Sequence, residues 1–171
     1  MAITRLNHAV LYVRDVAASE AFYRDVLGFR TVMSVPGQAV FLRAEASTND
    51  HDLGLFQIGA AAGPSGAGRT TVGLYHLAWE VQTLGELAAV RDRLRSAGAF
   101  VGESDHVTTK SLYAHDPDGL EFEVSWLLPA DLITDEVRER GMGTFRLDLE
   151  GEIARYGADT LGGLGVSIPI S

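Results

Sequence analysis

The chain of 171 residues contains no cysteine. Disulfide bonds, thiolate metal sites and a cysteine nucleophile are therefore excluded, and His, Asp and Glu remain as the main candidate metal ligands. Basic residues are also few: 14 lysines and arginines stand against 23 acidic residues, which gives a net charge of −9. This balance argues against a nucleic-acid partner and against an anionic membrane surface.

Long apolar runs are missing as well. No stretch of the sequence approaches the roughly 20 apolar residues of a membrane-spanning helix, and residues 1–6 contain no such run either. We therefore expect a cytoplasmic protein without a membrane partner. With 46% hydrophobic and 22% charged residues, the composition is that of one globular domain or of two small fused modules.

One local repeat is present. The stretches 6–13 (LNHAVLYV) and 74–81 (LYHLAWEV) align without a gap, so His8 and His76 occupy equivalent positions 68 residues apart. Each stretch resembles a strand and is followed by a helix-like stretch that ends at glycine. A duplicated unit that contributes one histidine from each copy, together with a later carboxylate, can build a metal centre of two histidines and one carboxylate.

The elements after each copy follow the same order. In the first unit a helix capped by Asp15 runs to about Leu27, and in the second a helix starts at Thr83, whose spacing to Glu86 is that of a capping box. Three strand candidates follow each helix. They are 29–33, 39–43 and 51–58 in the first unit, and 99–101, 107–114 and 120–126 in the second, with a turn at 116–119 (DPDG).

Two tandem βαβββ modules indicate an α+β fold. We expect the modules to form one curved mixed-sheet cleft, followed by a C-terminal extension with helix candidates at 131–140 and 149–156. For the apolar tail around Val166, Ile168 and Ile170 the sequence leaves three arrangements open: packing on the core, packing on a partner subunit, or covering the cleft. The expected boundaries are 1–62 for the first module, 63–70 for a linker, 71–127 for the second module and 128–171 for the extension.

Strand alternation predicts which side chains line the cleft, because successive side chains point to opposite faces of a sheet. In 120–126 the apolar residues alternate and should pack against a helix, so Glu121 and Glu123 should face the cleft. His76 and, by the repeat, His8 take the same face. The other residues assigned to this face are Val10, Tyr12, His51, Leu53, Leu55, Gln57, Ala78, Glu80, Val107, Thr109, Ser111, Tyr113 and Ser125.

Four further segments form a recognisable set: 7–13 (NHAVLYV), 22–29 (FYRDVLGF), 75–78 (YHLA) and 116–123 (DPDGLEFE). Together they resemble the vicinal oxygen chelate superfamily of glyoxalases, bleomycin resistance proteins and extradiol dioxygenases. The resemblance covers about residues 4–127 and implies a divalent metal held by His8, His76 and Glu123. Glu123 is preferred over Glu121 because it stands four residues after a glycine, as the family pattern requires.

Further segments resemble single-chain catechol 2,3-dioxygenase-like proteins. The segment 50–56 (DHDLGLF) is similar to one that carries a catalytic histidine, which implies that His51 acts as an acid–base. By the same resemblance Tyr113 would hydrogen-bond the substrate and His106 would orient it. Non-catalytic interpretations of these residues remain open. His51 could simply lie in a turn, and Tyr113 could be an aromatic residue at the rim of the cleft. His115 is expected to be structural or solvated.

The resemblance implies an Fe(II)-dependent extradiol dioxygenase of aromatic catabolism, a homodimer that acts on a catechol-like small molecule and O2. Mn(II), Zn(II) and Ni(II) remain as other metals. One rival is a glyoxalase-like lyase or isomerase with Ni(II) or Zn(II), which would recruit Gln57 as a fourth ligand although an amide is a poorer ligand than the usual glutamate. The other rival is a metal-free drug- or metabolite-binding protein of the bleomycin-resistance type.

Overall fold

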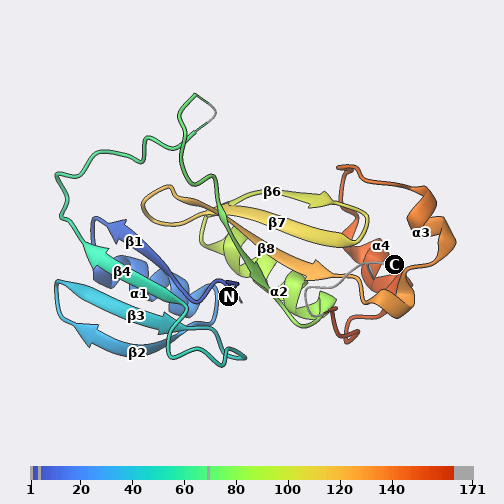
Figure 1. Ribbon diagram of the computed structural model, residues 1–171, viewed down its shortest axis with the longest axis horizontal. Coiled ribbons are helices and arrows are strands. Elements are labelled where there is room, and N and C mark those ends of the chain that lie inside the picture. Colours follow the sequence, from blue (N-terminus) through green and yellow to red (C-terminus); the bar gives the residue numbers. More distant parts are fainter. Residues whose placement is uncertain (1, 4, 69, 164–171) are drawn as a thin grey trace. The chain divides into compact units, whose positions relative to one another are not determined.

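The computed structural model describes residues 2–3, 5–68 and 70–163 (Figure 1). Two compact units can be distinguished: unit 1 is Met1–Gly66 with Asp116–Leu120, and unit 2 is Ala67–His115 with Glu121–Ser171. The apolar tail, whose packing the sequence left open, lies outside the described residues. None of the helices in the described part of the chain combines the length and the apolar character that crossing a membrane requires.

The first module has the expected βαβββ order. Its four strands form one sheet in the order β1-β4-β3-β2, in which β1 is parallel to β4 and the other neighbours are antiparallel. Asp15 caps the helix as predicted, because its carboxylate accepts hydrogen bonds from the backbone N–H groups of Ala17 and Ala18. The elements are β1 (Ala9–Val13), α1 (Val16–Asp25), β2 (Arg30–Val35), β3 (Ala39–Arg43) and β4 (Leu53–Gln57).

The second module repeats this topology, with the sheet order β5-β8-β7-β6 and β5 parallel to β8. Thr83 and Glu86 form the predicted reciprocal capping box. The first strands of the two modules start at Ala9 and Leu77, the same offset that separates the two histidines, so the repeat in sequence is a repeat in structure. The elements are β5 (Leu77–Glu80), α2 (Leu84–Ser96), β6 (Phe100–Asp105), β7 (Thr109–His115) and β8 (Glu121–Leu127).

The C-terminal extension adds three short helices to unit 2. They are η1 (Ala130–Leu132), α3 (Asp135–Glu139) and α4 (Leu149–Tyr156), of which α4 packs against α2. The buried indole of Trp126 at the end of β8 donates a hydrogen bond from Nε1 to the carbonyl oxygen of Thr160 at 3.1 Å. The extension is therefore part of the packed second unit up to the last described residues.

The predicted turn between β7 and β8 forms and belongs to unit 1. Gly119 closes it with φ 82°, and its N–H donates to the carbonyl oxygen of Asp116 at 2.9 Å. In unit 1 the Tyr23 hydroxyl donates to the Asp116 carboxylate at 3.2 Å, and Arg14 pairs with Asp118 at 2.7 Å. Burial raises the pKa of Asp116 above its ordinary value, against the hydrogen bonds that it accepts.

Burial confirms the predicted alternation in β8 and contradicts it in β4. The alternate apolar residues of β8 are buried, as expected. In β4, however, Leu53 and Leu55 are fully buried and therefore lie on the α1 side, not on the open face. Gln57 lies on that side as well, where its Oε1 accepts a hydrogen bond from the Val16 N–H at 3.1 Å. The assignment of Leu53, Leu55 and Gln57 to the cleft face is thus wrong.

The register of β4 against β1 explains this correction. Leu53 and Leu55 pair with Ala9 and Leu11, whereas the exposed residues of β1 are the alternate ones. His51 precedes β4 by two residues, so its position did not fix the alternation of the strand. Burial of two leucines decides the face instead.

Leu55→Ala should lower the free energy of unfolding by about 2–5 kcal/mol, because it leaves a cavity in a fully buried site. Urea unfolding of the variant and of the wild-type protein measures the change. The matched control is Leu6→Ala, since the Leu6 side chain is 76% exposed and should contribute less than about 0.5 kcal/mol. Equal effects of the two substitutions would contradict the burial of this face of β4.

Candidate functional site

Two of the predicted metal ligands lie side by side in unit 2. His76 directly precedes β5 and Glu123 lies in β8, where the parallel pairing sets Ala78 opposite Glu123. The Nε2 atom of His76 is 3.1 Å from Oε2 of Glu123. The other ring nitrogen, Nδ1, is buried without a hydrogen-bond partner among the described residues, and Oε1 of Glu121 lies 3.9 Å from it.

Two serine hydroxyls hold the Glu123 carboxylate from its other side. Ser125 Oγ donates to Oε1 of Glu123 at 2.8 Å, and Ser111 Oγ donates to the same oxygen. Both serines are buried and pair with each other across β7 and β8. The carboxylate is thereby oriented with Oε2 toward His76. Strand alternation predicted that both serines lie on this face but gave them no function. Their hydroxyl groups beside a predicted carboxylate ligand were the sequence signal that could have indicated this role.

Tyr113 and His106 belong to the same cluster. Tyr113 lies in β7 directly opposite Glu123, and its ring centre is 6.0 Å from that of His76. Its hydroxyl oxygen is 2.8 Å from Nε2 of His106. Burial, together with the negative charge of Glu123, raises the pKa of the Tyr113 phenol above its ordinary value. Tyr113 therefore carries its proton at neutral pH and is a hydrogen-bond donor.

His106 lies in the turn between β6 and β7, part of which the sequence predicted as strand. The next residue, Val107, has φ 72°, a left-handed conformation that β-branched residues rarely adopt. Its N–H donates to Oδ1 of Asp105 at 2.8 Å, and its carbonyl oxygen accepts from Lys110 Nζ at 3.1 Å. The predicted strand 107–114 therefore begins only at Thr109, because these side chains hold the backbone of the turn.

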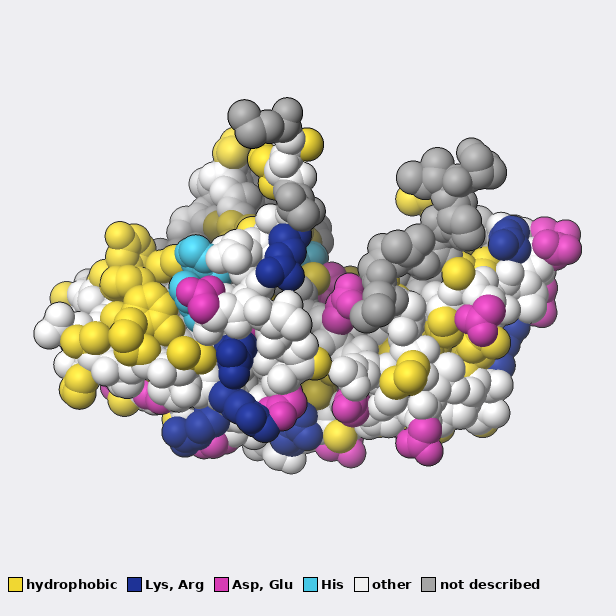
Figure 2. Space-filling view, turned by 60° about the horizontal axis from the view of Figure 1, so that its bottom comes forward, with side chains coloured by type: hydrophobic (Ala, Val, Ile, Leu, Met, Phe, Trp, Pro, Cys, Tyr) yellow, Lys and Arg dark blue, Asp and Glu magenta, His cyan; other side chains and the backbone are white. Residues whose placement is uncertain are grey.

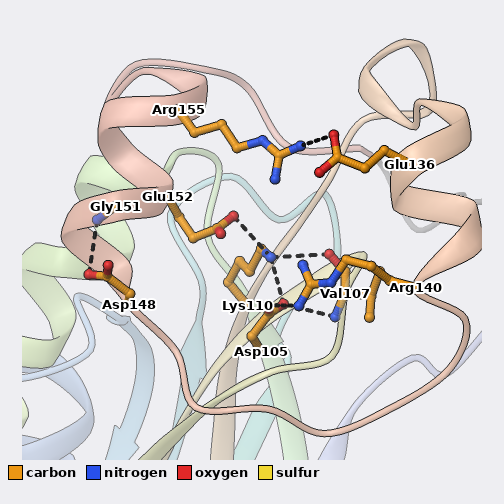
Figure 3. Close-up of polar contacts among 9 residues, drawn as sticks. All are labelled: Asp105, Val107, Lys110, Glu136, Arg140, Asp148, Gly151, Glu152 and Arg155. Carbon is orange, nitrogen blue, oxygen red and sulfur yellow. Dashed lines mark hydrogen bonds and ion pairs between the residues drawn. The ribbon is translucent and has the colours of Figure 1, made fainter.

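A buried ion-pair network anchors this turn (Figure 3). Lys110 is only 1% exposed, and its Nζ lies 2.6 Å from Oδ1 of Asp105 and 3.0 Å from Oε2 of Glu152. Oδ2 of Asp105 accepts a hydrogen bond from Arg140 at 2.9 Å. Burial opposes the charge of Asp105, but the hydrogen bonds from Lys110 and Arg140 outweigh it and lower the pKa of its carboxyl. Because Arg140 and Glu152 belong to the extension, the network joins the extension to the turn of His106.

His8 and His51 lie together in unit 1. His8 directly precedes β1, and the ring centres of the two histidines are 4.5 Å apart. The Phe41 ring meets His51 edge-on at 5.2 Å. His8 Nδ1 is 2.7 Å from Oδ1 of Asn7, and His51 Nδ1 is 3.2 Å from Oδ2 of Asp50. His51 thus lies in the loop before β4, but its largely buried ring is turned toward the predicted ligand His8.

The face of the first sheet opposite α1 is apolar and open. Val10 and Tyr12 project from it with 52% and 71% of their surface exposed, and the strand register adds Met33, Phe41 and Phe56 to this face. Figure 2 shows hydrophobic side chains gathered on unit 1 next to histidine side chains. An exposed apolar surface of this kind is typical of a ligand-binding or interaction site.

Among the described residues, the predicted site side chains form two groups, one in each unit. Unit 2 brings together His76, Glu123, Tyr113 and His106, and unit 1 brings together His8 and His51. Within neither unit do three His, Asp or Glu side chains of the described residues form a cluster that could hold a metal ion. His115 is half-exposed, and its Nε2 lies 3.6 Å from Oε2 of Glu121, whose other carboxylate oxygen lies 3.9 Å from His76 Nδ1.

The chain was compared with known protein families and matches the model of one of them. The family described as the Glyoxalase/Bleomycin resistance protein/Dioxygenase superfamily matches residues 5–124. The matched segment contains both modules up to Val124 in β8, and it ends before the C-terminal extension. Among solved structures, lactoylglutathione lyase from Agrobacterium tumefaciens aligns with a TM-score of 0.53 and 26% identity, covering 72% of this chain and 93% of that chain.

Two curated relatives are named as dioxygenases. The chain is 28% identical over 163 residues to catechol-2,3-dioxygenase of Bacillus subtilis (strain 168), which is 90% of this chain and 53% of that protein. It is 37% identical over 121 residues to biphenyl-2,3-diol 1,2-dioxygenase 3 of Rhodococcus globerulus, which is 67% of this chain and 59% of that protein. The chain therefore spans little more than half the length of these relatives.

Asp105→Asn should lower the free energy of unfolding at neutral pH by about 3 kcal/mol, because it removes one partner of a buried ion pair. The pKa of Asp105 is lowered in the folded state, so its contribution is complete above the unfolded pKa of about 4 and is lost as the pH falls through the folded pKa. Denaturant unfolding of both proteins from neutral to acidic pH should show the difference shrinking.

The control for this experiment is Asp92→Asn, at an exposed position of α2. Its effect should stay below about 1 kcal/mol at every pH. A difference between wild type and Asp105→Asn that does not change with pH would contradict the lowered pKa. No difference at all would contradict the ion pair.

Proposed function

The chain belongs to the glyoxalase/bleomycin resistance protein/dioxygenase superfamily, and on this premise we propose that it is an Fe(II)-dependent extradiol dioxygenase of a catechol-like aromatic. The observation that carries the proposal is the cluster in unit 2, where His76 Nε2 lies 3.1 Å from Glu123 and the Tyr113 phenol stands opposite that carboxylate. The two dioxygenase-named relatives support the same reaction class.

The donor set fits a divalent metal. The proposed ligands are His8, His76 and Glu123, and two imidazole nitrogens with one carboxylate oxygen suit Fe(II), as they suit Mn(II), Zn(II) or Ni(II). His76 Nε2 and Glu123 Oε2 lie 3.1 Å apart, a separation at which both atoms can bind one ion, and two serine hydroxyls hold the carboxylate in this orientation. When bound, Fe(II) supplies the redox chemistry that lets O2 react with an aromatic diol.

His51 is the proposed acid–base residue. The backbone N–H of His51 lowers the pKa of the Asp50 carboxyl, so this carboxylate is ionised beside Nδ1 of the His51 ring. A ring whose Nδ1–H faces a carboxylate presents Nε2 as the basic nitrogen. Nε2 of His51 would take a proton from a catechol hydroxyl and return it to the ring-opened product.

Tyr113 is the proposed substrate contact of unit 2, and the open apolar face is a candidate apolar surface of unit 1. The protonated Tyr113 phenol would donate a hydrogen bond to a substrate oxygen, and His106 orients that phenol. The exposed side chains around Val10, Tyr12 and Phe56 offer an apolar surface for an aromatic ring. The substrate is therefore proposed to be an aromatic diol rather than a highly charged metabolite. The homodimer predicted from the sequence stays part of the proposal, and light scattering in solution tests it.

A glyoxalase-like lyase or isomerase is the second candidate. The likeness to a lactoylglutathione lyase favours it. Gln57 is the predicted fourth ligand of such a lyase or isomerase. Its Oε1 instead accepts a hydrogen bond from the Val16 N–H on the α1 side of the sheet. This contact argues against recruitment of Gln57 and favours the three-ligand set of a dioxygenase.

His76→Ala should abolish stoichiometric iron binding, because it removes one of the proposed ligands next to Glu123. Iron counted after anaerobic loading and desalting should be about one per chain in the wild type and less than a tenth of that in the variant. His8→Ala should behave in the same way. The matched control is His115→Ala, which should keep the full iron content, whereas full iron in His76→Ala would refute the ligand assignment.

Oxygen uptake on adding a panel of catechols tests the reaction itself. The iron-loaded wild-type protein should consume O2 and form a yellow ring-opened product, and His51→Phe should keep its iron while turning over about 10²–10⁴-fold more slowly, the usual contribution of an acid–base residue. Full activity of His51→Phe would remove this role. One bound metal without oxygen uptake would favour the lyase or isomerase, and absence of metal binding would favour a binding protein.

A further inference from the structure

The C-terminal extension runs along the turn that carries His106. Phe145 and Asp105 form an isolated antiparallel bridge in which each N–H donates to the other carbonyl oxygen at 2.9 Å. The guanidinium of Arg140 lies over the Phe145 ring at 5.0 Å and also binds the Asp105 carboxylate. Phe145 is thus held against the turn by its backbone and Arg140 by its side chain, and Figure 3 shows the contact of Arg140 with Asp105.

This bridge brings Thr144 to His106. Thr144 Oγ1 lies 3.2 Å from Nδ1 of His106, while Nε2 of the same ring lies 2.8 Å from the Tyr113 hydroxyl oxygen. The imidazole is therefore held between two hydroxyl groups, one from the extension and one from the proposed site. Because a neutral imidazole has one N–H and one lone pair, the direction of one hydrogen bond sets the direction of the other.

Only one direction leaves the proton of Tyr113 free for a ligand. If the Thr144 hydroxyl donates to Nδ1, then Nε2–H of His106 donates to the Tyr113 oxygen, and the phenol O–H can point to a substrate. In the opposite tautomer Nδ1–H donates to Thr144, Nε2 accepts the phenol proton, and Tyr113 has no proton left for a substrate oxygen. A donating Tyr113 thus requires the Nε2–H tautomer.

We propose that Thr144 is a positioning residue that holds His106 in the Nε2–H tautomer, so that Tyr113 presents its proton to the substrate. The inference rests on the proposed function, because it specifies how Tyr113 becomes the substrate donor there. It also gives a role to the extension, which lies outside the residues matched by the family. The buried network of Asp105, Lys110 and Glu152 keeps the turn in place for this contact.

The tautomer is measured without metal or substrate. Long-range ¹H–¹⁵N correlation spectra of ¹⁵N-labelled, metal-free protein, recorded above the pH of imidazole titration, show which ring nitrogen of each histidine carries the proton. The signals of His106 are those missing in His106→Gln. The wild type should show His106 protonated at Nε2, Thr144→Ser should keep this state, and Thr144→Val should shift toward a mixture of tautomers. A wild-type Nδ1–H tautomer, or an unchanged tautomer in Thr144→Val, would overturn the proposal.

Kinetics separate this role from the proposed reaction. With catechols as substrate, Thr144→Val should lower kcat about tenfold, as expected when one orienting hydrogen bond is lost, with unchanged iron content and with rescue in Thr144→Ser. The control is Thr70→Val at an exposed position, which should match the wild type in both measurements. A tautomer shift in a protein that cleaves no catechol would sustain the positioning by Thr144 and refute the dioxygenase. Full kcat in Thr144→Val with a shifted tautomer would overturn the functional part of the positioning role.

Discussion

In each module the first and last strands pair in parallel, and this pairing positions the residues around which the candidate site is built. A parallel pair requires a long crossover, here a helix and two further strands, and it sets the start of the first strand beside the last strand. In unit 2 this pairing puts His76 beside Glu123, and in unit 1 it puts His8 beside the loop of His51. One backbone arrangement, used twice, therefore positions a group of predicted site residues in each unit.

The two units differ in the chemistry of these side chains. Unit 1 offers an apolar open face with two histidines, whereas unit 2 offers a carboxylate, hydroxyl groups and a phenol. The hydroxyl groups of Ser111 and Ser125 and the buried pair of Lys110 with Asp105 orient the polar groups of unit 2. Tyr113 pairs across the strands with Glu123, which this network orients, and this position supports its proposed role as the substrate donor.

The sequence predicted the features that depend on local pattern. The repeat, both helix caps, the turn before β8 and the alternation of β8 follow from short-range rules and are confirmed. The face of β4 was mispredicted because His51 stands outside the strand, so the burial of Leu53 and Leu55 decided the alternation. Asp105 and Lys110 hold the turn at Val107, and Arg140 and Glu152 of the C-terminal extension bind these two side chains. Thr144 of the extension contacts His106, and a pattern along the strand carries no signal for such contacts.

We propose that one metal ion is held by the two repeat-related histidines, His8 and His76, and by Glu123. Anomalous diffraction at the iron edge, from crystals of the anaerobically iron-loaded protein, would locate this ion. We expect one iron per chain with these three residues as its protein ligands. Iron bound at other residues, or at a site that lacks either of the two histidines, would refute the ligand assignment.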